Sequence, residues 1–200
     1  MRKALLIVCA ALCLGPATFG QALTAADRDR GVKYLEDKRD AIVDATKGLS
    51  EAQWKFKAAP DRWSVAETLE HIALAEEFIL GQVKDKIMQS PAGAPDRDTA
   101  KTDAAVLAMI PDRSHKFQAP PPLVPTGKWT PQETLDHFLK SRAETIEFMK
   151  TATDLRAHVA DSPLGMPLDG YEWLLFIGAH SERHTKQILE VKADPNFPKS

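Results

Sequence analysis

Apolar residues recur at helical spacing in four long stretches of this chain, and this pattern limits the folds that it can adopt. The stretches are residues 24–47, residues 64–89, a segment that begins at Thr130, and residues 170–192. In each stretch an apolar stripe faces one side and charged residues face the other. No segment combines strict apolar–polar alternation with turn residues, so we expect no strands. Four such helices in a single domain predict an all-α four-helix bundle.

A long connection separates the second and third predicted helices. It runs from Ser90 to Trp129, about 40 residues, and contains three consecutive prolines at 120–122 and a short helical pattern at 102–109. Connections of this length in a compact domain usually cross the fold or cover a site. We therefore expect a long crossover between helices 2 and 3 rather than a tight hairpin.

Residues 1–22 have the pattern of a secretory signal peptide. Two basic residues, Arg2 and Lys3, precede an apolar run, and small residues at its end offer a cleavage point. The run is too short for a transmembrane helix. The sequence therefore predicts cleavage near residue 22, a mature domain of residues 23–200, and a secreted or periplasmic location.

The predicted mature domain contains no cysteine, because Cys9 and Cys13 both fall within the signal segment. Disulfide bonds and thiolate catalysis are thereby excluded from that domain. Removing Arg2 and Lys3 leaves 24 basic against 28 acidic side chains, a net charge of −4. This mild acidity, with no basic stripe, argues against nucleic-acid binding. No second apolar run has the length of a membrane span.

Three histidines are placed where they can meet. His180 and His184 are four residues apart on the last predicted helix, so their side chains project from the same face. His71 lies on the apolar stripe of the second predicted helix. Three imidazoles can bind a metal ion and leave it an open position for water or substrate. A histidine pair at this spacing is a weak motif, however, and histidines that only make hydrogen bonds in the core are the alternative.

A partial repeat raises the question of whether His137 could replace His71. The ten residues that end at His71 recur in part 66 residues later, ending at His137, and much of the shared pattern is helix-start chemistry. The residues three, four and seven positions further on are Leu74, Ala75 and Phe78 in the first copy, and Lys140, Ser141 and Glu144 in the second. We therefore expect His71 to face packed structure and His137 to face water. His115 in the crossover and His158 near the end of the third helix have no partner at a useful spacing.

Other metal and nucleophile motifs fit the chain poorly. The zincin pattern needs a glutamate where this chain has Ser181, and di-iron bundles need paired Glu-x-x-His motifs, whereas Glu67 precedes His71 by four residues. The sequence identifies no catalytic residue and no general base. Glu67 is expected to cap its helix, with a contact to His71 as the alternative. Gln187 is expected either to orient a ligand or to be a partly exposed helix residue.

Two segments carry a resemblance to a known family. Residues 54–64 contain Trp-Lys-Phe-Lys and then Pro-Asp-Arg-Trp-Ser, and Glu67 and His71 follow. The last helix closes the pattern with its histidine pair and the Gln-Ile at 187–188. With these motifs the chain, over about residues 27–192, resembles the DinB-like (YfiT-like) metal-binding four-helix bundles.

The resemblance implies a divalent metal ion, zinc or nickel above all, bound by His71, His180 and His184. Members often form homodimers. The implied activity is that of a metal-dependent hydrolase or a thiol transferase with a small-molecule substrate. Predicted export argues against thiol transfer, because low-molecular-weight thiols are scarce outside the cytoplasm. A non-catalytic metal-binding or interaction bundle is the alternative function, and a metal-free structural bundle is a further one.

Overall fold

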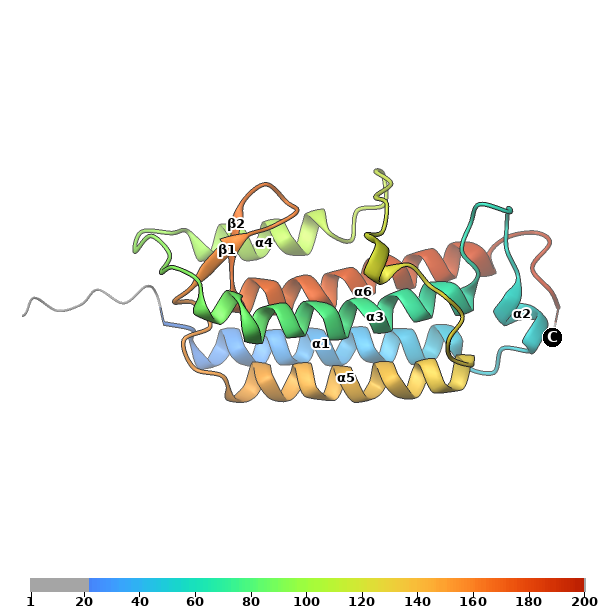
Figure 1. Cartoon of the computed structure of the whole chain (residues 1–200), viewed down its shortest axis with the longest axis horizontal. Helices are drawn as coiled ribbons and strands as arrows, with labels where there is room; N and C mark the ends of the chain where they lie inside the picture. The colour runs from blue at the N-terminus through green and yellow to red at the C-terminus, as the bar shows by residue number, and fades with distance from the viewer. Residues whose placement is uncertain (1–21, 200) are drawn as a thin grey trace, which may run out of the picture.

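The computed structural model describes residues 22–199, in which four long helices run side by side (Figure 1). They are α1 (Ala25–Thr46), α3 (Val65–Asp85), α5 (Pro131–Thr151) and α6 (Gly170–Lys192). Helix α1 packs on α5 and α6, and α3 packs on the same two helices from the other side. The predicted four-helix bundle is therefore confirmed.

Shorter elements lie between the long helices. They are α2 (Glu51–Lys55), η1 (Ile87–Gln89), α4 (Thr99–Met109) and η2 (Pro121–Leu123). The crossover therefore contains a full helix, α4, which packs on α6 (Figure 1). It begins earlier than the predicted residue 102, because the Asp98 side chain accepts a hydrogen bond from the Lys101 amide and caps the first turn.

A small hairpin, which the sequence did not predict, precedes α6. Strands β1 (Val159–Asp161) and β2 (Pro167–Asp169) pair in antiparallel fashion, and Gly165 between them has a φ of 72°. The expectation of no strands is wrong here, because a strand of three residues is too short to show an alternating pattern.

His158 does not lie near the end of the third long helix, as the sequence suggested. Helix α5 ends at Thr151, so His158 stands beside the hairpin, where its Nδ1 lies 2.5 Å from the Ser90 carbonyl oxygen. Apolar spacing did not reveal that the helix stops seven residues earlier. Because α5 ends at Thr151, the residues that follow are available to form β1.

A buried polar network lies at the centre of the bundle. The guanidinium of Arg142 on α5 donates to both carboxylate oxygens of Glu76 on α3, at 2.7 and 2.6 Å. It also donates to the Leu35 carbonyl on α1 and to the Ser181 hydroxyl on α6, at 2.8 and 2.7 Å. Because this one side chain bonds to the other three long helices, it fixes their relative register. Ser181 directly follows a candidate metal ligand, so the network also holds that part of α6 in place.

No helix within residues 22–199 is long and apolar enough to cross a membrane. The predicted signal peptide lies outside the described residues, except for its last residue.

Candidate metal centre

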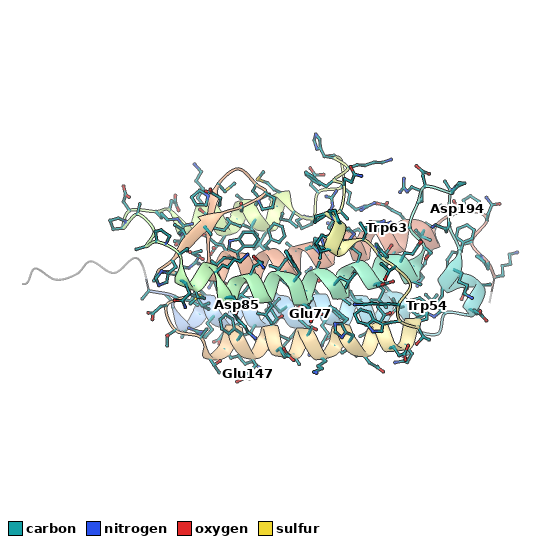
Figure 2. All side chains as sticks on the ribbon, viewed as in Figure 1. Trp54, Trp63, Glu77, Asp85, Glu147 and Asp194 are labelled. Atoms are coloured by element: carbon teal, nitrogen blue, oxygen red, sulfur yellow. The ribbon has the colours of Figure 1, made fainter. Side chains whose placement is uncertain are left out.

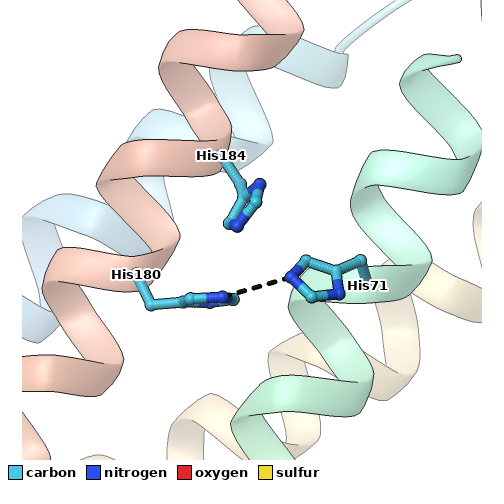
Figure 3. Close-up of side chains that lie close together, drawn as sticks. All are labelled: His71, His180 and His184. Atoms are coloured by element: carbon cyan, nitrogen blue, oxygen red, sulfur yellow. Dashed lines mark hydrogen bonds between the residues drawn. The ribbon is translucent and has the colours of Figure 1, made fainter. Parts of the chain in front are cut away.

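Three histidines from two helices converge at one point, as Figure 3 shows. One ring nitrogen from each of His71, His180 and His184 lies within 4.8 Å of the other two. The Nε2 atoms of His71 and His180 are 3.1 Å apart, and the His184 ring centroid lies 4.5 Å from that of His71. The structure thus brings together the three side chains that the sequence singled out.

A capping box sets the position of His71 on α3. The Ser64 hydroxyl accepts from the Glu67 amide at 3.2 Å, and the Glu67 carboxylate accepts from the Ser64 amide at 2.8 Å. The second oxygen of that carboxylate accepts from Lys57 at 2.8 Å. Glu67 is therefore a capping residue, as predicted, and not a partner of His71. His71 lies seven residues after Ser64, about two helical turns, and it faces α6.

Hydrogen bonds fix the tautomers of two of the rings. Nδ1 of His71 lies 2.7 Å from the Leu123 carbonyl oxygen, and Nδ1 of His184 lies 3.0 Å from the Gln187 side-chain oxygen. Only a protonated ring nitrogen can donate to a carbonyl, so both neutral rings keep the Nε2 lone pair free. Of the two roles considered for Gln187, the structure shows one that orients a histidine.

Burial keeps all three rings neutral, the form of imidazole that binds metal ions. It lowers the pKa of His71, which is 3% exposed. For His184, which is 8% exposed, burial and then the neighbouring charges of His71, Arg183 and Arg113 lower the pKa to about 3. Burial, followed by the other two histidines, holds the pKa of His180 well below its usual value, although this ring keeps some exposed surface.

Aromatic rings flank the histidine cluster. The ring centroid of Trp63 lies 4.8 Å from that of His71, and Phe176 stacks on His180 at 6.4 Å with an angle of 11° between the rings. Trp63 is labelled in Figure 2, on the side of the bundle where the crossover passes. These rings pack against the cluster, and His180 as a residue is partly exposed.

Sequence reasoning suggested that the crossover could cover a site, but it did not identify the residues through which the crossover contacts this one. Leu123 contributes a backbone carbonyl to His71, and Arg113 donates to the Gln187 oxygen at 3.2 Å. The long connection signalled that something was covered, but a backbone carbonyl carries no residue signature. No sequence pattern connected Arg113 with a site more than 70 residues away.

The remaining histidines lie apart from the cluster. His137 stacks on Trp129 with centroids 4.4 Å apart, bonds to Glu77 at 3.0 Å and is partly exposed. The rings of Trp63 and His71 make a similar tilted contact at the same sequence spacing, so the partial repeat reflects one local helix-start arrangement used twice. His115 is exposed; its ring contacts Ser114, and its backbone carbonyl accepts a hydrogen bond from Arg183.

The donor set fits a divalent transition-metal ion. Two zinc–nitrogen bonds of about 2.0–2.1 Å can span at most about 4.2 Å, so small ring rotations would bring nitrogens up to 4.8 Å apart onto one ion. The Nε2 atoms of His71 and His180 share one proton in a hydrogen bond. A metal ion could displace that proton and bind the lone pairs of both nitrogens. Within the described part of the chain no carboxylate joins the three-histidine group, which leaves an ion with open positions.

A four-helix bundle with three histidines gathered from two of its helices defines the class of this protein. The sequence profile of the DinB superfamily matches residues 34–188, and the chain belongs to that superfamily. The expected resemblance to the DinB-like (YfiT-like) bundles is thereby confirmed.

Two relatives extend this comparison. The chain is 26% identical over 151 residues to the uncharacterized protein YuaE of Bacillus subtilis (strain 168), a match that covers 73% of this chain and 87% of YuaE. It is also similar in structure to YfiT from Bacillus subtilis, described as a probable metal-dependent hydrolase with an unusual four-helix bundle topology. That match has a TM-score of 0.56 at 14% identity and covers 89% of this chain and 93% of YfiT. The likeness to YfiT shows a shared fold.

Proposed function

We propose that this protein binds a divalent metal ion, zinc or nickel, through His71, His180 and His184 and acts as a metal-dependent hydrolase or transferase on a small molecule. The observation that carries the proposal is the convergence of three neutral imidazoles, two of them held with Nε2 free. The description of YfiT as a probable metal-dependent hydrolase supports it.

The chain's own residues have separable roles in this proposal. His71 and His184 present Nε2, and the oxygens of Leu123 and Gln187 hold the two rings in position. Trp63 and Phe176 contact the rings of His71 and His180 and contribute to the surroundings of the ion. A bound divalent ion would lower the pKa of water or a thiol, or polarise a carbonyl group.

Export is part of the proposal and rests on the signal-like sequence of residues 1–22. Outside the cytoplasm hydrolysis is favoured over transfer to low-molecular-weight thiols, because those cosubstrates are scarce there. Detection of the mature protein in the periplasmic or secreted fraction, with an N-terminus near residue 23, checks this part. Retention of the full-length chain in the cytoplasm would contradict it.

Metal analysis of three proteins tests the metal site. The wild type, purified from its native compartment, is compared with His180→Ala and with the control His137→Ala, which removes a tryptophan-stacked histidine away from the cluster. We expect close to one metal ion per chain in the wild type and the control, and almost none in His180→Ala. Equal, negligible metal in all three proteins would overturn the proposal.

A non-catalytic metal-binding protein is the second candidate function. It is favoured by one observation: within residues 22–199 no carboxylate is hydrogen-bonded to any of the three histidines, so no general base stands ready. Assays of the metal-loaded protein with ester, amide and thiol–electrophile substrates separate the two functions. Turnover that is lost in His180→Ala indicates an enzyme, and inactivity across the panels favours the binding protein.

A further inference from the structure

The groups that support the histidines carry no negative charge. Metal-binding histidines are often backed by a carboxylate, which makes the imidazole a stronger donor and neutralises part of the ion's charge. Here the partners are a backbone carbonyl, Leu123, and a side-chain amide, Gln187. An ion bound by three neutral imidazoles would therefore keep nearly its full double charge.

Acidic residues close to the histidines in sequence are engaged elsewhere. Glu70, beside His71, accepts from the backbone amides of Thr126 and Gly127 at 3.0 and 2.8 Å. Glu182, which lies between His180 and His184 in the sequence, instead binds side chains of α1 and of its own helix, α6. Its partners are Tyr34, Lys38 and Lys186, at 3.1, 2.8 and 2.9 Å. Neither carboxylate is hydrogen-bonded to a histidine.

A buried cation lies next to the cluster. Arg183 on α6 is 8% exposed, and its charge is near enough to contribute to the lowered pKa of both His180 and His184. Its guanidinium donates to the backbone carbonyls of Ile110, Asp112 and His115, and it lies 5.1 Å from the ring centroid of Phe117. Among residues 22–199 it forms no direct salt bridge with a carboxylate. Burial and the neighbouring Arg113 lower the pKa of Arg183 and outweigh Asp112 and Glu190, which offset part of its charge, so its surroundings remain electropositive.

A second cation reaches the cluster through Gln187. Arg113 donates to the Gln187 oxygen at 3.2 Å, and the same oxygen receives the His184 Nδ1 hydrogen. The other nitrogens of Arg113 bind Glu190 at 2.6 and 2.7 Å, so its charge is partly offset. Gln187 thus lies between an arginine and a neutral histidine, and its uncharged amide does not offset the positive charge of Arg113.

We propose that the electropositive surroundings of the three-histidine centre, set by Arg183 and by the neutral Gln187 with Arg113, make it select an anionic group of the substrate, a carboxylate or a thiolate, as its open-position ligand. This inference rests on the proposed function, since it needs a bound metal ion. It adds the chemical class of the group that the ion would bind. Arg183 and Gln187 act as positioning and specificity-determining residues and not as ligands.

Cobalt(II) reconstitution of the full chain provides the test, because the visible spectrum of cobalt reports both metal binding and a new ligand. Azide is the anion probe, imidazole is the neutral probe, and both are titrated into the loaded protein. We expect Arg183→Met to weaken azide binding roughly tenfold, as loss of one nearby charge would, and to leave imidazole binding unchanged. Arg183→Lys, which keeps the charge, should restore azide binding. The matched control Lys186→Met removes an exposed cation of the same helix, already paired with Glu182, and should bind azide like the wild type.

A second variant, Gln187→Glu, distinguishes the electrostatic role of these residues from a purely structural one. It tests the proposal even if Arg183→Met does not fold. The new carboxylate behind His184 should raise cobalt affinity, on the order of tenfold, and should weaken azide binding. A structural defect would instead lower both affinities. Acetate and 2-mercaptoethanol, titrated in the same way, then show whether a carboxylate or a thiolate is preferred.

The outcomes distinguish the two proposals. Stoichiometric cobalt with azide binding equal in the wild type, Arg183→Met and Gln187→Glu would overturn this inference and leave the metal proposal intact. Absence of cobalt binding by the wild type would overturn the proposed function and this inference with it.

Discussion

At the scale of single residues, two of the three clustered histidines differ from His137 in their burial. His71 and His184 are almost inaccessible to solvent, whereas His137 is partly exposed beside Glu77. A buried imidazole pays a desolvation penalty when it takes a proton, so its neutral form is favoured. The same burial that prepares the rings for a metal ion makes the metal-free protein sensitive to acid.

This sensitivity gives a prediction for the metal-free protein. The folded-state pKa of His184 is lowered to about 3 from 6.5, so below pH 6.5 the unfolded chain binds a proton that the folded chain does not. Stability is therefore full above pH 6.5 and falls as the pH drops towards 3, by about 1.4 kcal/mol per pH unit for this residue.

Urea denaturation at pH 7 and pH 5 measures the effect. His184→Gln should lose about 2 kcal/mol less of its free energy of unfolding between these two pH values than the wild type loses. The same pH dependence in both proteins would show that His184 accepts its proton without leaving the folded state.

At the scale of elements, α3 and α5 begin with the same chemistry and serve different ends. Each starts with a complete capping box, formed by Ser64 and Glu67 in α3 and by Thr130 and Glu133 in α5. Each then places a histidine under a tryptophan ring. The difference lies in what each histidine meets: His71 on α3 lies against the histidine pair of α6, whereas His137 on α5 is partly exposed and bonds to Glu77.

The two caps form a matched pair for mutation. Ser64→Ala and Thr130→Ala should each lower the free energy of unfolding by about 1 kcal/mol, because each leaves amides of the first turn without an acceptor. Only Ser64→Ala should also weaken cobalt binding, since fraying of α3 loosens His71. Denaturation and cobalt titration of both variants check this, and equal cobalt affinities would show that α6 holds His71 in place without the cap.

At the scale of the whole molecule, the buried pair of Arg142 and Glu76 connects all four long helices. Arg142 is 0% exposed and Glu76 is 2% exposed, and Thr145 donates a further hydrogen bond to the carboxylate at 2.7 Å. A charge in such a place is tolerated only while its partner is present. The bundle therefore depends on the pair being complete.

Removal of one partner should accordingly cost more than removal of both. We expect Arg142→Leu to lower the free energy of unfolding by about 3–5 kcal/mol, and the double variant Arg142→Leu with Glu76→Leu to lower it less. Arg39→Leu, which removes an exposed pair with Asp40, should cost about 1 kcal/mol or less. Urea denaturation of the three variants measures these changes, and a double variant less stable than Arg142→Leu would contradict the account.

The crossover shows what packing adds at this scale. Two of its residues support histidines of the metal centre. The Leu123 carbonyl accepts from His71, and Arg113 donates to the Gln187 oxygen that also accepts from His184. The long connection, which the sequence predicted to cross the fold or cover a site, therefore supports two of the three histidines through these contacts.

The sequence by itself determined the features that depend on neighbours along the chain. Apolar spacing gave the four helices, the caps gave two of their starts, and the i, i+4 relation put His180 and His184 on one face. The apolar surroundings of His71 distinguished it from His137. Only the tertiary structure decided that His71 meets the pair on α6, that a crossover carbonyl orients it, and that Arg183 lies near that pair without a direct salt bridge to a carboxylate of residues 22–199. The physical reason is that side-chain spacing on a helix is set by local geometry, whereas contacts between distant segments, above all those made by backbone carbonyls, depend on how the whole core packs.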